Sequence, residues 1–322
     1  LGIACFLFFI FGSDEINAAE LLGSIIMYLY ISGKLITPIS NLNNQYASTL
    51  AHHNAIENLD NYYEMARNNI QKMGYRKTLK SSQIIKFKDV SFKYKNSNVN
   101  VLNQINFSIP TNKLTAIVGV SGTGKTTIIN LITRLLEPQL GKVYIGNELL
   151  NNIQLYEWRR QCKVITQEII LLNVSLRENM CFGYTKNITD AEIFYALKLA
   201  GAYNFVKKLP NGLDTNLGQN GLRLSGGQQQ RISIARAMID KPNYIIFDEA
   251  TSNLDTVNEK AIISTLQALK KNTTIIVIAH RLSVIKKADK IIYIDKGKVM
   301  SEGKHEKLIK NKNDYTKLFK SH

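Results

Sequence analysis

Long uncharged runs open the chain, and they are followed by polar stretches that alternate with shorter apolar segments. Residues 1–11 are nearly all apolar, residues 12–20 are polar and acidic, and residues 21–40 are mostly apolar again. The second run comes close to the ~20 residues that a membrane-spanning helix requires. We therefore expect a spanning helix over about 21–40, preceded over 1–11 by part of another membrane helix. A signal peptide is the alternative for residues 1–11, but no basic region precedes them.

The charges on either side of the second run predict its orientation. Acidic residues precede it, while basic residues follow it at Arg67, Lys72, Arg76, Lys77 and Lys80. By the positive-inside rule, its carboxyl end faces the cytoplasm. Helical periodicity continues over 41–65 without Gly or Pro, so the helix is expected to extend into the cytosol. We interpret residues 1–70 as the C-terminal part of an all-α transmembrane domain in the plasma (cytoplasmic) membrane. A soluble core helix hairpin over residues 1–65 is the alternative.

From residue 71 the pattern changes twice. Residues 71–83 are polar and basic without a period, which is typical of a linker. Val90, Phe92 and Tyr94 then alternate with polar residues, as in a strand with one buried face. Further apolar runs follow at 101–109, 114–118, 244–247, 274–279 and 291–294. Helical stretches between several of these runs predict an α/β domain over 84–322 with a largely parallel core sheet.

The run at 114–118 leads directly into a glycine-rich loop, Gly119-Val-Ser-Gly-Thr-Gly-Lys-Thr126. This is the phosphate-binding pattern G-x-x-x-x-G-K-[ST], in which backbone N–H groups surround phosphate oxygens. Lys125 is expected to reach the β- and γ-phosphates, and the Thr126 hydroxyl to bind Mg²⁺. The loop therefore predicts a P-loop NTPase, with ATP-binding residues Gly119, Ser121, Gly122, Gly124, Lys125, Thr126 and Thr127.

Two carboxylates follow the apolar run at 244–247. A buried parallel strand would place Asp248 and Glu249 at the edge of the sheet that carries the phosphate loop. Asp248 is suited to the Mg²⁺ shell, and Glu249 to the role of general base for the attacking water. Alone, such a pair would more often be a solvated turn. The phosphate loop upstream favours the catalytic interpretation.

A second candidate anion site begins at Leu224-Ser225-Gly226-Gly227-Gln228. These residues open a predicted helix whose N-terminal N–H groups would face an anion. One ATP molecule does not need two such sites in one subunit, so we expect this segment to complete the ATP site of a partner subunit. The alternative is an ordinary Ser N-cap followed by glycines.

Together, these motifs resemble the ATP-binding cassette (ABC) family over roughly residues 84–319. The resemblance implies a P-loop domain with a helical subdomain that carries the Leu224–Gln228 signature. It also implies that Tyr94 stacks on adenine, and that Gln167 touches Mg²⁺ and senses the membrane domain. Asp255 would lie in a loop at the dimer interface. His280 would act near the γ-phosphate, beside the catalytic residues Glu249, Lys125 and Gln167.

The fused membrane segment indicates which kind of ABC protein the chain resembles. Importers usually keep the cassette on a separate chain, and the stretches at 173–179 and 209–221 resemble those of exporters. The family often has Glu where this chain has Gln219, which puts a charged contact there in doubt. Exporter subunits have about six membrane helices, so we expect a fragment of a longer half-transporter, with a degenerate gene as the alternative.

Composition adds predictions about partners. The net charge of +16 is expected to reflect a cytosolic surface near anionic lipid and a polyanionic nucleotide, with no nucleic-acid partner. Three cysteines without metal-like spacing fit a reducing compartment. The intact motifs favour a homodimer of half-transporters that uses ATP and Mg²⁺ to export an unidentified substrate. A non-transport ABC ATPase with a mechanical or regulatory role and an inactive remnant are the alternatives.

Overall fold

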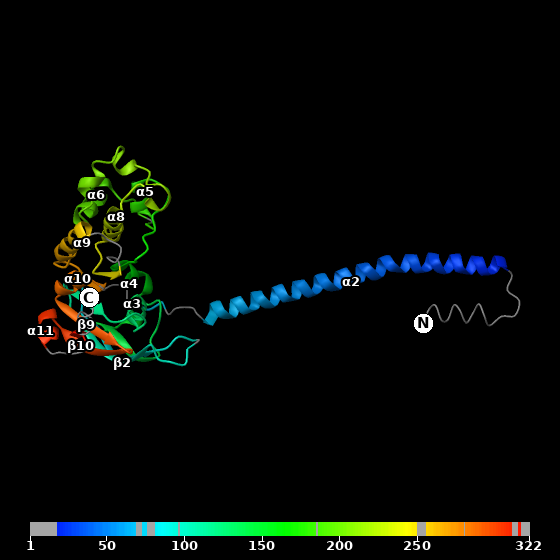
Figure 1. Ribbon diagram of the computed structural model, residues 1–322, viewed down its shortest axis with the longest axis horizontal. Helices are drawn as coiled ribbons and strands as arrows, with labels where there is room; N and C mark the ends of the chain where they lie inside the picture. The colour runs from blue at the N-terminus through cyan, green and yellow to red at the C-terminus, as the bar shows by residue number, and fades with distance from the viewer. Residues whose placement is uncertain are drawn as a thin grey trace. The chain divides into compact units, whose positions relative to one another are not determined.

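The protein is described here from a computed structural model, which covers residues 18–68, 73–75, 81–95, 97–184, 186–249, 256–279, 281–310 and 315–316. The chain divides into two compact units, Leu1–Gln71 and Lys72–His322 (Figure 1). The predicted partial helix at residues 1–11 lies outside the described residues.

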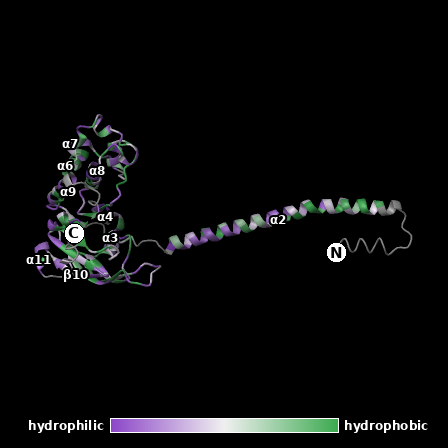
Figure 2. Ribbon diagram, viewed as in Figure 1, coloured by the Kyte–Doolittle hydropathy of each residue, from purple (hydrophilic) through white to green (hydrophobic). Residues whose placement is uncertain are grey.

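The first unit contains one continuous helix, α2 (Ala18–Asn68). The predicted extension of the helix beyond residue 40 is confirmed, and the chain stays helical through Pro38, although proline supplies no N–H group to the helix. Apolar residues dominate its N-terminal half and polar residues its C-terminal half (Figure 2). Among the described residues, the segment Leu22–Arg67 is the one that is long and apolar enough to cross a membrane, judged by length and composition.

The second unit is built on two sheets. The larger sheet has the strand order β10-β9-β3-β8-β7-β6, in which β9, β3, β8, β7 and β6 run parallel and β10 pairs antiparallel with β9. The smaller sheet is antiparallel, with the order β2-β1-β4-β5. The strands are β1 (Ile85–Phe92), β2 (Leu102–Ile109), β3 (Leu114–Val118), β4 (Leu140–Ile145), β5 (Glu148–Leu149), β6 (Cys162–Ile165), β7 (Tyr244–Asp248), β8 (Thr274–Ile278), β9 (Lys290–Asp295) and β10 (Lys298–Gly303).

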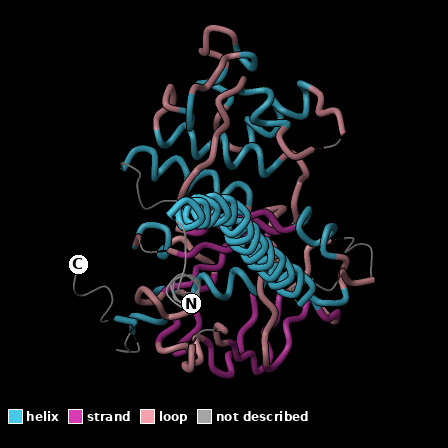
Figure 3. The backbone as a smooth tube through the Cα atoms, turned by 90° about the vertical axis from the view of Figure 1, so that its right-hand side faces the viewer, coloured by secondary structure: helices cyan, strands magenta, loops and turns pink. Residues whose placement is uncertain are grey.

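Helices flank the strands and form a separate lobe around α5, α6 and α8 (Figures 1 and 3). The helices of this unit are α3 (Lys125–Ile132), α4 (Leu155–Gln161), α5 (Leu176–Cys181), α6 (Asp190–Leu199), α7 (Tyr203–Val206), α8 (Gly226–Met238), α9 (Thr256–Leu269), α10 (Leu282–Lys286) and α11 (His305–Lys310). Short 3₁₀ turns lie at η1 (Leu150–Asn152), η2 (Gly212–Asp214) and η3 (Gln219–Gly221).

Both faces of the larger sheet are buried, which explains why its strands are continuous apolar runs. In β7, Tyr244 and Ile246 pack into one hydrophobic cluster, with α3 and the smaller sheet. Ile245 and Phe247 pack into the other cluster, which continues into the helical lobe. The predicted largely parallel core sheet is thus confirmed, and the phosphate loop follows directly from its strand β3.

Two details differ from the sequence prediction. Tyr94 lies beyond the end of β1 and is exposed, because the pairing with β2 ends at Phe92 and Leu102. Register shifts between Phe87 and Val90 and between Val90 and Phe92 also interrupt the alternation that the sequence suggests. The antiparallel pairing of β1 with β2 and β4 was not predicted, since the pattern alone gave no strand partners.

Candidate nucleotide site

The phosphate loop connects β3 to α3, as predicted. Gly124 is the N-cap of α3 and has the left-handed φ of 99°. A Cβ atom there would also lie 2.6 Å from the Leu102 side chain, so only glycine fits without rearrangement. With no side chain to cap this end, the first N–H groups of α3 are positioned to bind an anion.

Lys125 lies at the start of α3, where its side chain is buried beneath the loop. Its Nζ donates hydrogen bonds to the carbonyl oxygens of Gly119, at 3.0 Å, and Val120, at 2.8 Å. Burial lowers the pKa of Lys125, while the negative charges of Glu249 and Asp248 act in the opposite direction. The loop therefore holds a cation between its own carbonyl groups and two carboxylates.

A cavity of about 270 Å³ lies over the loop. It brings together most of the predicted ATP-binding residues and the predicted general base. Its lining consists of Tyr94, Val101, Ser121, Gly122, Gly124, Lys125, Thr126, Thr127 and Glu249. The arrangement has an aromatic ring and a hydroxyl-bearing loop at a common opening, as a nucleotide requires.

Tyr94 is held at the cavity by two contacts. Its hydroxyl lies 3.2 Å from the Thr127 hydroxyl, and its ring packs edge-on against Phe92 with the centroids 5.1 Å apart. The ring is 42% exposed, which leaves surface for stacking by a flat ligand. The structure thus places Tyr94 at the cavity but beyond the strand in which the sequence pattern had placed it, and its stacking on adenine stays a prediction.

The two carboxylates lie at the end of β7. Asp248 is the last residue of the strand, and Glu249 follows it with a φ of 53°. A left-handed backbone is uncommon for Glu and is maintained only where the surrounding structure imposes it. After this turn, Glu249 lines the cavity together with Lys125, and the charges of both Glu249 and Asp248 act on the Lys125 ammonium group.

Other predicted site residues lie elsewhere. Gln167 is exposed just after β6 and does not line the cavity. Residues Leu224–Gln228 belong to the start of α8 in the helical lobe and do not line it either. Asp255 and His280 lie outside the described residues.

The start of α8 is organised differently from that of α3. Ser225 Oγ accepts a hydrogen bond from the Gln228 amide, and Gln228 Oε1 accepts one from the Ser225 amide, which forms a complete capping box. Ser225 and Gly226 are exposed, and a Cβ at Gly226 would meet nothing within 4 Å. Gly227 instead packs closely on α9, where a Cβ would lie 2.4 Å from Asn258.

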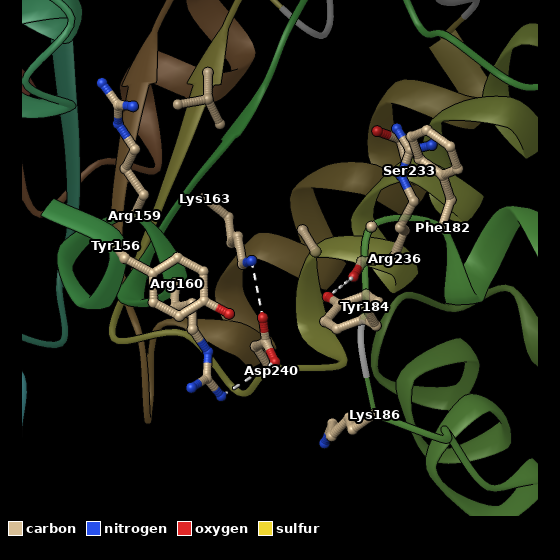
Figure 4. A pocket seen from close by; sticks show the side chains of 13 residues that line it. Tyr156, Arg159, Arg160, Lys163, Phe182, Tyr184, Lys186, Ser233, Arg236 and Asp240 are labelled. Atoms are coloured by element: carbon tan, nitrogen blue, oxygen red, sulfur yellow. Dashed lines mark hydrogen bonds and ion pairs between the residues drawn. The ribbon is translucent and has the colours of Figure 1, made fainter.

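A second cavity, of about 550 Å³, opens between α4 and β6 on one side and the helical lobe on the other (Figure 4). Basic side chains dominate its lining, and Asp240 forms ion pairs with Lys163, at 2.9 Å, and with Arg160, at 3.8 Å. The lining residues are Tyr156, Arg159, Arg160, Lys163, Val164, Phe182, Gly183, Tyr184, Lys186, Ser233, Arg236, Ala237 and Asp240. Sequence reasoning missed this cavity because its residues come from separate segments without a shared motif.

Comparison with known proteins relates this site to a protein family. Residues 102–252, which span the phosphate loop, the α8 signature and both carboxylates, match the ABC transporter family. The second unit carries an ABC transporter domain. This domain has the P-loop fold predicted from the sequence.

Relatives extend the similarity beyond this domain. The ATP-dependent lipid A-core flippase of Haemophilus influenzae (strain 86-028NP) is 43% identical over 235 residues, which is 73% of this chain and 40% of the relative. That of Francisella tularensis subsp. tularensis (strain FSC 198) is 34% identical over 100% of this chain and 52% of the relative. A bacterial Atm1-family ABC exporter solved with ATP bound has a TM-score of 0.74 at 28% identity, covering 99% of this chain and 55% of that one. The chain thus spans about half the length of these proteins, or less.

Proposed function

We propose that this chain is the ATP-hydrolysing portion of an exporter subunit, and that two such subunits enclose two ATP molecules and couple their hydrolysis to export across a membrane. The observation that carries this proposal is the division of the site. Lys125 and Glu249 meet at one cavity, whereas the exposed α8 signature lies outside it. A second subunit would supply the missing anion-binding surface.

The residues at the cavity suit phosphoryl transfer. Lys125 and the first N–H groups of α3 would stabilise the charge on the transferred phosphoryl group. Glu249 would accept a proton from the attacking water, which it can reach from the cavity wall. Gln167 and His280 are proposed to complete the catalytic set when the dimer closes.

The residues at this site fit Mg²⁺ only if phosphates and water supply part of its coordination shell. Among the described residues, no group of three or more His, Cys, Asp or Glu side chains could hold a metal. The oxygen donors at hand are the exposed Thr126 hydroxyl and the Asp248 carboxylate, with Gln167 proposed to join them. Such a sparse set suits Mg²⁺, which takes its remaining ligands from phosphates and water. Bound there, Mg²⁺ would neutralise phosphate charge.

The membrane role rests on α2 and on the relatives. The apolar N-terminal half of α2 is proposed to span the plasma membrane with the ATPase domain in the cytoplasm, as the basic residues after it predict. Relatives named lipid A-core flippases favour an amphiphilic lipid as the cargo. Membrane lipid and a second identical subunit are thus the proposed partners, and nucleic acid is not.

Reconstitution of the full-length subunit in liposomes tests this function. We expect Mg-ATP to drive a fluorescent lipid A-type glycolipid from one leaflet to the other, and the glycolipid to stimulate phosphate release. The E249Q variant should do neither. Phosphate release without movement of glycolipid would reject a lipid cargo. Release that is also insensitive to reconstitution in the membrane would favour a non-transport ATPase.

A further inference from the structure

The segment Met73–Tyr75, which we call the linker anchor, is bound to the ATPase domain by its main chain. The Leu155 amide, the first of α4, donates a hydrogen bond to the Met73 carbonyl oxygen at 2.8 Å. The Tyr75 amide donates one to the Asn152 carbonyl oxygen at 2.9 Å. The Gln154 side chain forms no capping bond at this helix end, so the anchor satisfies an N–H group that α4 would otherwise present to water.

Gly74 makes this close approach possible. Its φ is +72°, and a Cβ there would lie 2.2 Å from the Ile153 carbonyl oxygen and 2.9 Å from that of Asn152. Both neighbours are rigid main-chain atoms, so any other residue would displace the anchor. The side chains of Met73 and Tyr75 are 71% and 73% exposed, which means that the main chain makes the attachment.

The peptide group that Gly74 touches is held from the other side by Arg134. The Arg134 side chain is 2% exposed, and its Nη1 donates to the Ile153 carbonyl oxygen at 2.6 Å. Arg134 follows α3 within two residues and has a left-handed φ of 53°. The anchor is therefore connected, through one peptide group, to the C-terminal end of the helix that begins at the nucleotide cavity.

Helix α4 is fastened to the same end of α3. Trp158 Nε1 donates to the Ile132 carbonyl oxygen at 2.7 Å, and Arg159 Nη2 donates to that of Arg134 at 3.0 Å. The first bond uses a carbonyl group that an α-helix leaves unsatisfied at its C-terminus, and the second binds the chain just beyond the C-cap Thr133. Since α3 has eight residues, the nucleotide cavity and this junction are separated by one rigid rod of about 12 Å.

We propose that the linker anchor transmits ATP-dependent movement of the α3–α4 pair to α2, with Gly74 and Arg134 as positioning residues. The proposal rests on the proposed function. Only four residues, 69–72, separate Asn68, the last residue of α2, from Met73. A chain of this length spans at most ~18 Å between the Cα atoms of Asn68 and Met73. Without the anchor, the first attachment to the domain would come at Ser82 and Gln83, which are hydrogen-bonded to Thr274 and Tyr244. The longer connection would absorb small displacements.

Two pairs of variants of the full-length subunit in nanodiscs test this inference. G74A creates the main-chain collision, and its control, G212A, replaces another left-handed glycine (φ +53°) that has open space around it. Y75P removes the donor to Asn152, and its control, Y75A, removes only the exposed side chain. In an E249Q background, hydrogen–deuterium exchange is measured at residues 60–75 and 150–156 with and without Mg-ATP, and ATP affinity is measured alongside. Basal ATP turnover is measured in the native background.

We expect G74A to raise exchange at the Tyr75 and Leu155 amides by about tenfold or more, and Y75P, which has no amide at position 75, to do so at Leu155. Both variants should abolish the Mg-ATP response at the end of α2. ATP affinity and basal turnover should stay within about twofold in both variants. The two controls should match the parent in every readout. An intact ATP response at α2 in G74A or Y75P, or unprotected Tyr75 and Leu155 amides in the parent, would overturn this inference alone. A parent without any ATP response at α2 would overturn the coupling in the proposed function as well.

Discussion

The two glycine-rich helix starts in this chain, at α3 and at α8, are built in opposite ways. The start of α3 has no side-chain cap, lies under a cavity, and holds the buried Lys125 between loop carbonyls and carboxylates. The start of α8 is closed by its own Ser225–Gln228 capping box and is exposed. The first therefore needs a ligand from solution, whereas the second is stable by itself and presents a surface.

This difference assigns separate tasks to the two helix starts. Changes at α3 and at the adjoining end of β7 should affect a single subunit, either in how it binds ATP or in how it cleaves ATP. Changes at the exposed surface of α8 should leave ATP binding by one subunit intact and should affect turnover only after two subunits meet. Measuring ATP affinity and turnover separately distinguishes these cases.

The largest effect is expected for E249Q. The amide has the size of the carboxylate but cannot accept the proton of the attacking water, so turnover should fall by about 10²–10⁴-fold. ATP affinity should be unchanged, and the ATP-bound dimer should accumulate. Phosphate release, nucleotide binding and size-exclusion chromatography measure these three properties.

The matched control for this variant is E168Q, which makes the same chemical change at an exposed position away from the cavity. It should hydrolyse ATP at the parent rate. Normal turnover in E249Q would show that Glu249 is not the general base. The left-handed turn after β7 would then not serve to place a catalytic carboxylate.

The next effect is expected for K125M, which keeps the length of the side chain and removes its charge. ATP affinity should fall by about 100-fold, because charge-assisted bonds to phosphate are lost in a buried setting. Turnover should fall with it, whereas E249Q affects turnover alone. Equilibrium binding of a fluorescent ATP analogue measures the change, with K113M as a control at an exposed turn. Unchanged affinity in K125M would contradict the proposed phosphate site.

The same contrast explains what the sequence could and could not predict. The α3 site was predictable because a contiguous motif, Gly119–Thr126, encodes a loop whose geometry follows from its glycines. Asp248 and Glu249 were predictable because parallel strands end at one edge of a sheet. The end of β1 was not predictable, because where the strand ends depends on its pairing with β2, which stops at Phe92 and leaves Tyr94 outside. The linker anchor was hidden for a similar reason, because it joins Gly74 to residues nearly eighty positions later through main-chain atoms.

The smallest but most selective effect is expected for G226D. A Cβ at this position meets nothing within its own subunit, and a carboxylate in the first turn favours the helix by about 0.3–1 kcal/mol, so the melting temperature should stay the same or rise slightly. ATP affinity of one subunit should also be unchanged. Turnover should nevertheless fall by at least about tenfold, because the added charge would face the phosphates bound by the partner. G226S and G212D separate the effect of size from that of charge and should both remain active. Full turnover in G226D would mean that α8 does not complete a partner's site, and the contrast between the two helix starts would then be one of folding alone.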